Sequence, residues 1–171
     1  MIRLLTGSTH TGKTLLAQRL LERHGAPYLS IDHLKMGLIR SGMCPLTPES
    51  TDEALTAVLW PVVREIVKTA VENGQSLTGE GCYIPFNWRE DFDASCLPHI
   101  RFLCLVFSEA YIRTRFDTIQ THANAIERRK DDSFCTMELL LAENRRNLEA
   151  CRRRGLPYYL IDGPYAPPLD W

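Results

Sequence analysis

The sequence predicts an α/β protein in which a central five-stranded parallel sheet lies between two layers of helices. Short, nearly apolar segments alternate along the chain with longer segments of helical periodicity, which is the pattern of repeated strand–helix units. Strands that are apolar on both sides suit a sheet that helices cover on both faces. Hydrophobic residues make up 44% of the chain and charged residues 24%, so a sizeable core can form.

Five strands are expected, and the clearest is IRFLCLVF at residues 100–107. The other four are expected at residues 2–6, 28–31, 76–78 and 158–161. Ligands of parallel sheets bind beyond the carboxyl ends of the strands. The groups that follow four of these strands are therefore candidate site residues: Gly7 to Thr14, Asp32, Glu80 and Ser108.

Helices are expected at residues 13–23, 33–40, 52–73, from Ser108 to about Ala123, and at 136–154. The first of them places four leucines on one face: Leu15, Leu16, Leu20 and Leu21. Ser108 can cap the fourth helix. Pro61 lies inside the long third pattern, and it should start a new helix or kink this one, because proline lacks the N–H and crowds the preceding turn.

The bulk properties fit a single domain of 171 residues and exclude several classes of function. A net charge of −1 argues against non-specific binding of nucleic acid. No apolar run is long enough to cross a membrane or to form a secretory signal. The six cysteines are scattered without the spacing of a zinc site, and reduced thiols suit a cytoplasmic protein.

The segment GSTHTGKT, residues 7–14, matches the phosphate-binding pattern G-x-x-x-x-G-K-[ST] between an expected strand and an expected helix. Two glycines let the backbone close around a phosphate, and successive N–H groups then form an anion nest at the helix N-terminus. In this pattern Lys13 reaches the β- and γ-phosphates and Thr14 ligates Mg²⁺. The alternative is a glycine-rich turn without a ligand. The expected nucleotide contacts are Gly7, Ser8, Thr9, His10, Thr11, Gly12, Lys13, Thr14 and Leu15, with His10 only at the periphery.

Over essentially its whole length the chain resembles the small P-loop kinases, which include adenylate, shikimate and gluconate kinases, 2-phosphoglycerate kinase and zeta-toxin-like enzymes. The segment SIDHLKMGLIR, residues 30–40, is similar to the stretch after their second strand. The resemblance implies that Asp32 is the general base or orients the acceptor hydroxyl, and that Arg40 contacts an anion. The alternatives are a helix N-cap for Asp32 and a surface charge for Arg40.

Two further segments resemble these kinases. SLTGEGCYI, residues 76–84, implies that Glu80 binds the acceptor or a magnesium-bound water, although the strand is shorter than in P-loop proteins that place Asp at this point. FSEAYIRTRF, residues 107–116, implies that Arg115 packs on adenine or touches phosphate. Gly163 is similar to the loop residue that lines adenine.

A short lid is expected at about residues 120–135, of the size found in shikimate-type kinases. Ile119 stands where adenylate kinases carry a lid arginine, so Arg128 and Arg129 are the expected catalytic substitutes. Such arginines neutralise charge on the phosphoryl group in transfer. Arg145 and Arg146 are weaker candidates, and for any one of these four a solvated surface charge is the alternative.

These expectations combine into one functional hypothesis. The protein would be an ATP- and Mg²⁺-dependent kinase that transfers the γ-phosphoryl group of ATP to a hydroxyl or phosphate oxygen of a small molecule whose identity the sequence leaves open. The acceptor is expected against residues 33–60 and 81–98, which contain Trp60, Tyr83, Phe86 and Trp88. The alternative is a regulatory nucleotide-binding NTPase that has no small-molecule acceptor. A switch GTPase is disfavoured because the chain has no N-K-x-D stretch. The oligomeric state is open.

Overall fold

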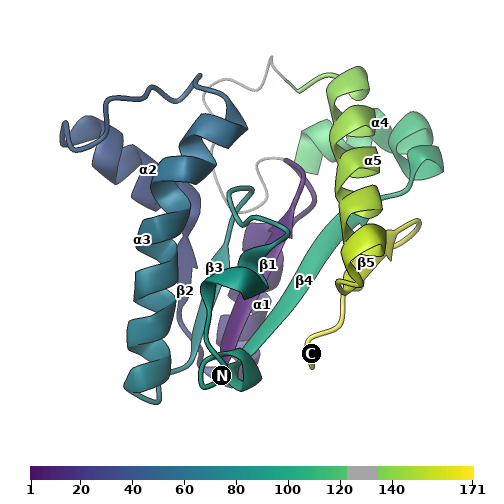
Figure 1. The fold of residues 1–171 in the computed structure, drawn as a ribbon. Coiled ribbons are helices and arrows are strands. Elements are labelled where there is room, and N and C mark those ends of the chain that lie inside the picture. Colours follow the sequence, from purple (N-terminus) through teal and green to yellow (C-terminus); the bar gives the residue numbers. More distant parts are fainter. Residues whose placement is uncertain (123–134) are drawn as a thin grey trace.

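The computed structural model describes residues 1–122 and 135–171 (Figure 1). Within them lies a five-stranded sheet in the order β2-β3-β1-β4-β5, and every neighbouring pair is parallel. The strands are β1 (Ile2–Gly7), β2 (Tyr28–Ser30), β3 (Leu77–Glu80), β4 (Ile100–Phe107) and β5 (Tyr158–Ile161). The central strand β1 is buried along its whole length, so its carboxyl end lies at the middle of the sheet edge.

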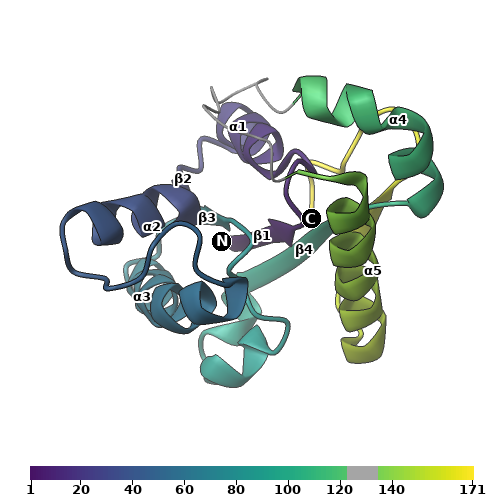
Figure 2. The ribbon, with the colours of Figure 1, turned by 90° about the horizontal axis from the view of Figure 1, so that it is seen from above.

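Helices cover both faces of this sheet and give the predicted three-layer α/β/α arrangement (Figure 2). They are α1 (Lys13–His24), α2 (Ile31–Arg40), α3 (Asp52–Glu72), α4 (Glu109–His122) and α5 (Met137–Arg154), with two short 3-10 helices, η1 (Trp88–Asp91) and η2 (Leu97–His99). None of the helices in the described part of the chain is long and apolar enough to cross a membrane.

Alternation along β4 divides the core into two clusters. Phe102, Cys104 and Val106 face a cluster that α2, α3 and residues 81–97 complete. Leu103, Leu105 and Phe107 face the opposite cluster, which α1, α4 and the C-terminal residues complete. Helix α5 contributes to both clusters. Successive side chains of a strand point to opposite faces, so one apolar strand supplies both halves of the core.

Two sequence predictions about helix boundaries are wrong. The alternative that Pro61 starts a new helix is wrong, because α3 runs unbroken from Asp52 to Glu72 with Pro61 inside it. Pro61 and Ala57 are both exposed, so water can satisfy the Ala57 carbonyl that loses its N–H partner. The second strand ends at Ser30, and Ile31 already begins α2. Asp32 therefore lies in the first turn of a helix, where a carboxylate interacts favourably with the helix dipole.

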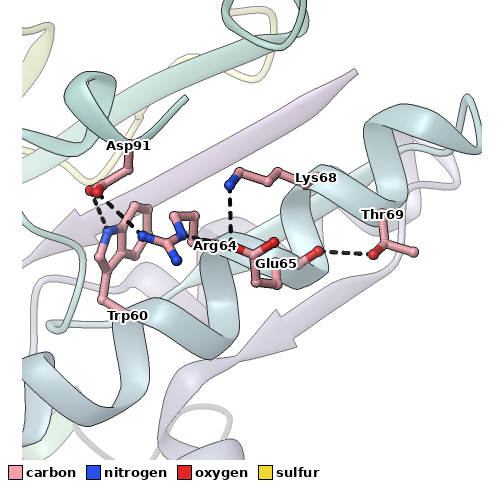
Figure 3. A network of polar contacts seen from close by, with 6 residues as sticks. All are labelled: Trp60, Arg64, Glu65, Lys68, Thr69 and Asp91. Atoms are coloured by element: carbon pink, nitrogen blue, oxygen red, sulfur yellow. Dashed lines mark hydrogen bonds and ion pairs between the residues drawn. The ribbon is translucent and has the colours of Figure 1, made fainter. Parts of the chain in front are cut away.

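A polar contact joins α3 to the 3-10 helix η1, and this contact holds residues 81–98 against the core (Figure 3). The buried Trp60 donates from Nε1 to Oδ2 of Asp91 at 2.8 Å, and Arg64 lies 3.5 Å from Oδ1 of the same carboxylate. Glu65 accepts from both Arg64 and Lys68 on the outer side of the helix. Trp60 is thus a core residue, and its indole N–H is satisfied by Asp91.

We expect Asp91→Ala to lower the free energy of unfolding by about 1–3 kcal/mol, because it leaves the buried Trp60 N–H without an acceptor. Asp91→Asn is the matched control, since its amide oxygen can still accept from Trp60 and only the charge toward Arg64 is lost. Urea unfolding followed by tryptophan fluorescence measures both variants. Equal stabilities for Asp91→Ala and the wild type would contradict this account of how η1 is held.

Candidate active site

The loop between β1 and α1 can be built only with glycine at two places. Gly7 has φ 142°, and a Cβ atom there would overlap the carbonyl oxygen of Leu105 on β4. Gly12 has φ 79° in the left-handed region, and a Cβ atom there would lie 2.8 Å from the ring of Tyr165. Side chains at these places would be strained or would clash. Both glycines of the motif therefore lie where a neighbouring group leaves no room for a side chain.

Lys13 begins α1 and is 7% exposed. Its Nζ donates to the Ser8 carbonyl at 2.8 Å, and the Thr11 hydroxyl donates to the same oxygen at 2.8 Å. Burial acts to lower the pKa of Lys13, but the potential of Cys82, Glu80 and Asp32 outweighs it and raises the pKa overall. Burial in turn raises the pKa of the Cys82 thiol. At neutral pH, Lys13 is therefore an ammonium group that faces two carboxylates.

Thr14 and Glu80 place two side-chain oxygens close together beside the loop. The Thr14 hydroxyl donates to Oε1 of Glu80 at 3.3 Å, and Glu80 is 2% exposed at the end of β3. Among the described residues there is no group of three or more His, Cys, Asp or Glu that could hold a metal ion. Mg²⁺ is commonly held by one or two protein oxygens together with phosphates, and this pair suits that mode.

One cavity of about 1320 Å³ connects the predicted site residues. Residues 7–15, Asp32 and Glu80 all line it, so the structure brings together groups that follow three different strands. Ser108, the fourth candidate, does not line this cavity. Its hydroxyl accepts from the Tyr111 N–H at 3.0 Å and donates to Asp162. Ser108 thus caps α4, as its position before that helix predicted.

Asp32 is held by a residue that the sequence reading missed. Nζ of Lys35 lies 2.8 Å from Oδ1 of Asp32 and donates to the Tyr83 hydroxyl at 2.9 Å. Burial acts to lower the pKa of Lys35, but Asp32 and Tyr83 raise it overall. Burial raises the pKa of Tyr83 to about 12. At neutral pH, Lys35 is therefore an ammonium group and Tyr83 a neutral phenol. The only local signal of the contact was the i, i+3 spacing of Asp32 and Lys35.

Helix α5 also reaches the loop, which the sequence did not predict. The Ser8 hydroxyl donates to Oε2 of Glu143 at 2.5 Å. Asn144 fixes this part of α5 to the sheet, because its Oδ1 accepts from the Phe107 N–H at 2.8 Å. Arg146 lines the cavity, whereas Arg145 faces Glu109 on the exposed surface at 3.4 Å. Of these two weaker lid candidates, only Arg146 is placed at the site.

Arg115 and Gly163 come together in a second cavity of about 410 Å³. Arg115 interrupts the helical geometry of α4, with φ −130° and ψ 20°. Tyr111 and Thr118 line both cavities, so the second cavity adjoins the first. Arg115 and the loop after the last strand therefore line one cavity.

Arg40 is placed away from the site, contrary to the expectation that α2 would carry it back to the cleft. It ends α2 exposed and does not line the large cavity. Eight residues of helix move a side chain about 12 Å along the axis, so Arg40 and Asp32 lie at opposite ends of the same helix. Arg128 and Arg129, and most of the expected lid at 120–135, lie outside the described residues.

No protein-family model matches the chain, and no curated protein matches it. Solved structures do. A gluconokinase from Sinorhizobium meliloti 1021 has a TM-score of 0.53 at 19% identity, over 98% of this chain and 83% of that one. The deoxyadenosine kinase of M. mycoides has a TM-score of 0.55 at 11% identity, over 95% and 90%. A sugar kinase from Janibacter sp. HTCC2649 has a TM-score of 0.52 at 18% identity, over 94% and 84%.

The fold is that of the small P-loop kinases. The resemblance stated from the motifs is confirmed at the level of fold. GSTHTGKT occupies the strand-to-helix turn after the central strand, which is the place that the P-loop pattern requires. At these sequence identities the comparisons establish the fold alone, and the chemistry depends on this chain's own residues.

We expect Gly7→Ala to lower the free energy of unfolding by more than Gly25→Ala. Both glycines have positive φ, but a Cβ atom at Gly25 meets nothing within 4 Å, whereas one at Gly7 overlaps the backbone of β4. Gly25→Ala should therefore show the conformational strain alone, about 1–2 kcal/mol. Gly7→Ala should lose at least about 1 kcal/mol more. Urea unfolding compares the two, and equal losses would show that the close approach to Leu105 is not a constraint.

Proposed function

We propose that this protein is an ATP- and Mg²⁺-dependent kinase that transfers the γ-phosphoryl group of ATP to a hydroxyl group of a small molecule. The observation that carries the proposal is that the P-loop and Asp32 line one cavity. A phosphate cradle and a carboxylate that can orient a hydroxyl therefore face the same space. Structural similarity to a gluconokinase, a sugar kinase and a deoxyadenosine kinase supports this proposal.

The residues present fit the nucleotide and the metal ion. Backbone N–H groups of the loop and the Lys13 ammonium would hold the phosphates, because both supply positive potential at the N-terminus of α1. The Thr14 hydroxyl and the Glu80 carboxylate would hold Mg²⁺. When bound, the ion would neutralise charge on the phosphates. The small cavity beside Arg115 and Gly163 would receive the base.

Asp32 would orient the acceptor. The carboxylate accepts a hydrogen bond from the acceptor hydroxyl and takes its proton as the new P–O bond forms, and ADP leaves with the electrons of the broken bond. Lys35 keeps the carboxylate in place through a contact of 2.8 Å. Phosphoryl transfer depends mainly on positioning and on electrostatic stabilisation, so a fixed carboxylate is sufficient for this role.

This arrangement also favours a kinase over a regulatory NTPase. A regulatory NTPase needs to hold only nucleotide and water. It does not need a set of ordered side chains beyond the γ-phosphate to hold an acceptor. Here Asp32, Lys35 and Tyr83 form such a set, with the aromatic ring of Phe86 and the side chain of Met36 beside it. The cavity of about 1320 Å³ is larger than most small-molecule sites need, which suits two substrates side by side.

The charges at the acceptor end favour a neutral acceptor over an anionic one. Glu49 and Asp52 line the cavity there. Burial raises the pKa of Asp52, and the nearby Glu143 adds to this effect because two negative groups lie close together there. The cationic side chains that line this end already have partners among the described residues. The ammonium of Lys35 contacts Asp32 and Tyr83, and the charge of Arg146 lowers the pKa of Asp52. We therefore propose an uncharged, hydroxyl-bearing acceptor.

The test of the proposed function is release of ADP from Mg·ATP in a coupled assay, with a panel of nucleosides, sugars, sugar acids and phosphorylated metabolites. One acceptor should stimulate the rate. Lys13→Ala and Asp32→Asn should each reduce the stimulated rate by about a hundredfold or more, because they remove phosphate binding and hydroxyl orientation. Asp117→Asn, an exposed aspartate of α4 that lines neither cavity, is the control.

Slow hydrolysis that no acceptor stimulates, and that Asp32→Asn leaves unchanged, would instead favour the regulatory NTPase. Stimulation that survives Asp32→Asn would remove Asp32 from the mechanism while leaving the transferase activity.

The charges at the acceptor end predict an order of preference among acceptors that share one carbon skeleton. Glucose, gluconate and glucose 6-phosphate differ in charge while sharing most hydroxyl groups. We expect kcat/KM to be at least about tenfold higher for the neutral member of such a set than for its anionic members, because like charges brought together in a cleft repel. The double variant Glu49→Gln, Asp52→Asn should narrow this difference. A preference for the anionic member would contradict the proposed acceptor class.

A further inference from the structure

The last nine residues fold back from β5 onto α1 (Figure 2). Arg23 of α1 holds Asp170 with two hydrogen bonds, from Nε to Oδ1 at 3.2 Å and from Nη2 to Oδ2 at 2.6 Å. The ring of His24 contacts the Leu169 carbonyl at 2.9 Å. Leu169 and Trp171 pack on the core cluster that contains α1. The C-terminal tail, residues 163–171, is therefore attached to the helix that follows the P-loop.

One tail residue touches the P-loop itself. The Tyr165 hydroxyl donates to the Gly12 carbonyl at 2.7 Å, and its ring lines the large cavity. The guanidinium carbon of Arg19 lies 5.6 Å from the centre of that ring, within the range of a cation–π contact. Burial raises the pKa of Tyr165, so the hydroxyl stays protonated and able to donate at neutral pH.

The contact at Gly12 has a consequence for phosphate binding because a peptide unit is planar. The Gly12 carbonyl and the Lys13 N–H belong to one peptide unit, and no cis peptide bond occurs among the described residues. In a trans unit the carbonyl and the N–H point in opposite directions. The hydrogen bond from Tyr165 therefore fixes the direction of the Lys13 N–H, and it supplements the helical bond from Leu16 to the same carbonyl at 2.9 Å.

We propose that Tyr165 is a positioning residue of the nucleotide site, which fixes the Gly12–Lys13 peptide so that the Lys13 N–H faces the phosphates. The Arg23–Asp170 pair keeps the tail, and with it Tyr165, in register with the loop. This inference rests on the proposed function only in taking the ligand of the loop to be a nucleotide. It concerns the phosphate groups of that ligand and does not depend on the acceptor.

The test compares Tyr165→Phe with the wild type. It uses two ligands, one that represents the phosphate groups of the nucleotide and one that represents its nucleoside. Phenylalanine keeps the ring, its packing on Gly12 and its contact with Arg19, and loses only the hydroxyl. Dissociation constants for Mg·tripolyphosphate and for adenosine are measured by competition with a fluorescent ATP analogue. We expect tripolyphosphate to bind about three- to tenfold more weakly to Tyr165→Phe, and adenosine to bind equally well to both proteins.

Three further variants sharpen the result. Tyr158→Phe changes an exposed tyrosine of β5 that lines neither cavity, and it should leave both dissociation constants unchanged. Asp170→Arg should weaken tripolyphosphate binding by breaking the contact with Arg23, and the charge-swapped pair Arg23→Asp, Asp170→Arg should restore it. Restoration would assign the effect to attachment of the tail, because a general loss of folding is not reversed by exchanging two exposed charges.

Unchanged tripolyphosphate binding in Tyr165→Phe would overturn the proposal, and so would an equal loss for adenosine, since that would make Tyr165 a contact of the base or a structural residue. Failure of this inference and failure of the proposed function give different results. If Lys13→Ala weakens tripolyphosphate binding and Tyr165→Phe does not, only the role of Tyr165 is lost. If the wild type binds neither the nucleotide analogue nor tripolyphosphate, both proposals fail.

Discussion

The site depends on how closely the backbone at the end of β1 approaches β4. Gly7 pairs with Leu105 in the sheet and turns away from it with φ 142°, so close to the Leu105 carbonyl that no side chain fits. Since β1 lies between β3 and β4, the loop leaves the sheet at its centre. Glu80 at the end of β3 then comes beside the loop. Gly7 thus sets the position of the β1–α1 loop relative to the Glu80 carboxylate.

The charges around the loop are arranged to keep Lys13 protonated although it is buried. An isolated buried ammonium would lose its proton, but Cys82 and the carboxylates of Glu80 and Asp32 raise the pKa of Lys13 again after burial has lowered it. The same two carboxylates line the cavity. They therefore have two effects, since they stabilise the cation that would meet the phosphates and they supply oxygen ligands where a metal ion and a hydroxyl would lie.

The sequence was sufficient for the fold and for the centre of the site, because both leave local signals. Apolar strands and periodic helices repeat along the chain, and the motif spacing places two glycines where side chains would clash. Asp32 and Glu80 could be found because strand ends meet at one edge of a parallel sheet. Arg40 lies away from the cavity because it ends α2, whereas Asp32 begins it. For Lys35, the only local signal was its spacing of three residues from Asp32.

The contacts that support the loop leave no local signal at all. Ser8 and Glu143 are 135 residues apart in the sequence, and Gly12 and Tyr165 are 153 residues apart. The sequence around Ser8 does not indicate that α5 will pack beside it. The sequence around Tyr165 does not indicate that the tail will pack against the P-loop. Side-chain contacts of this kind follow from the packing of whole elements, and they become visible only when the elements are placed.

The two core clusters explain how two substrates could be held apart and still meet. The P-loop continues into α1, which packs on one face of the sheet together with α4 and the tail. Asp32 and Tyr83 belong to α2 and to residues 81–98, which pack on the other face. The proposed nucleotide side and the proposed acceptor side would thus be built on opposite faces of one sheet and would approach each other at its carboxyl edge. There Lys13, Glu80 and Asp32 line a common cavity, because the parallel strands end together. The sheet itself is therefore the part that fixes the distance between the two halves of the site.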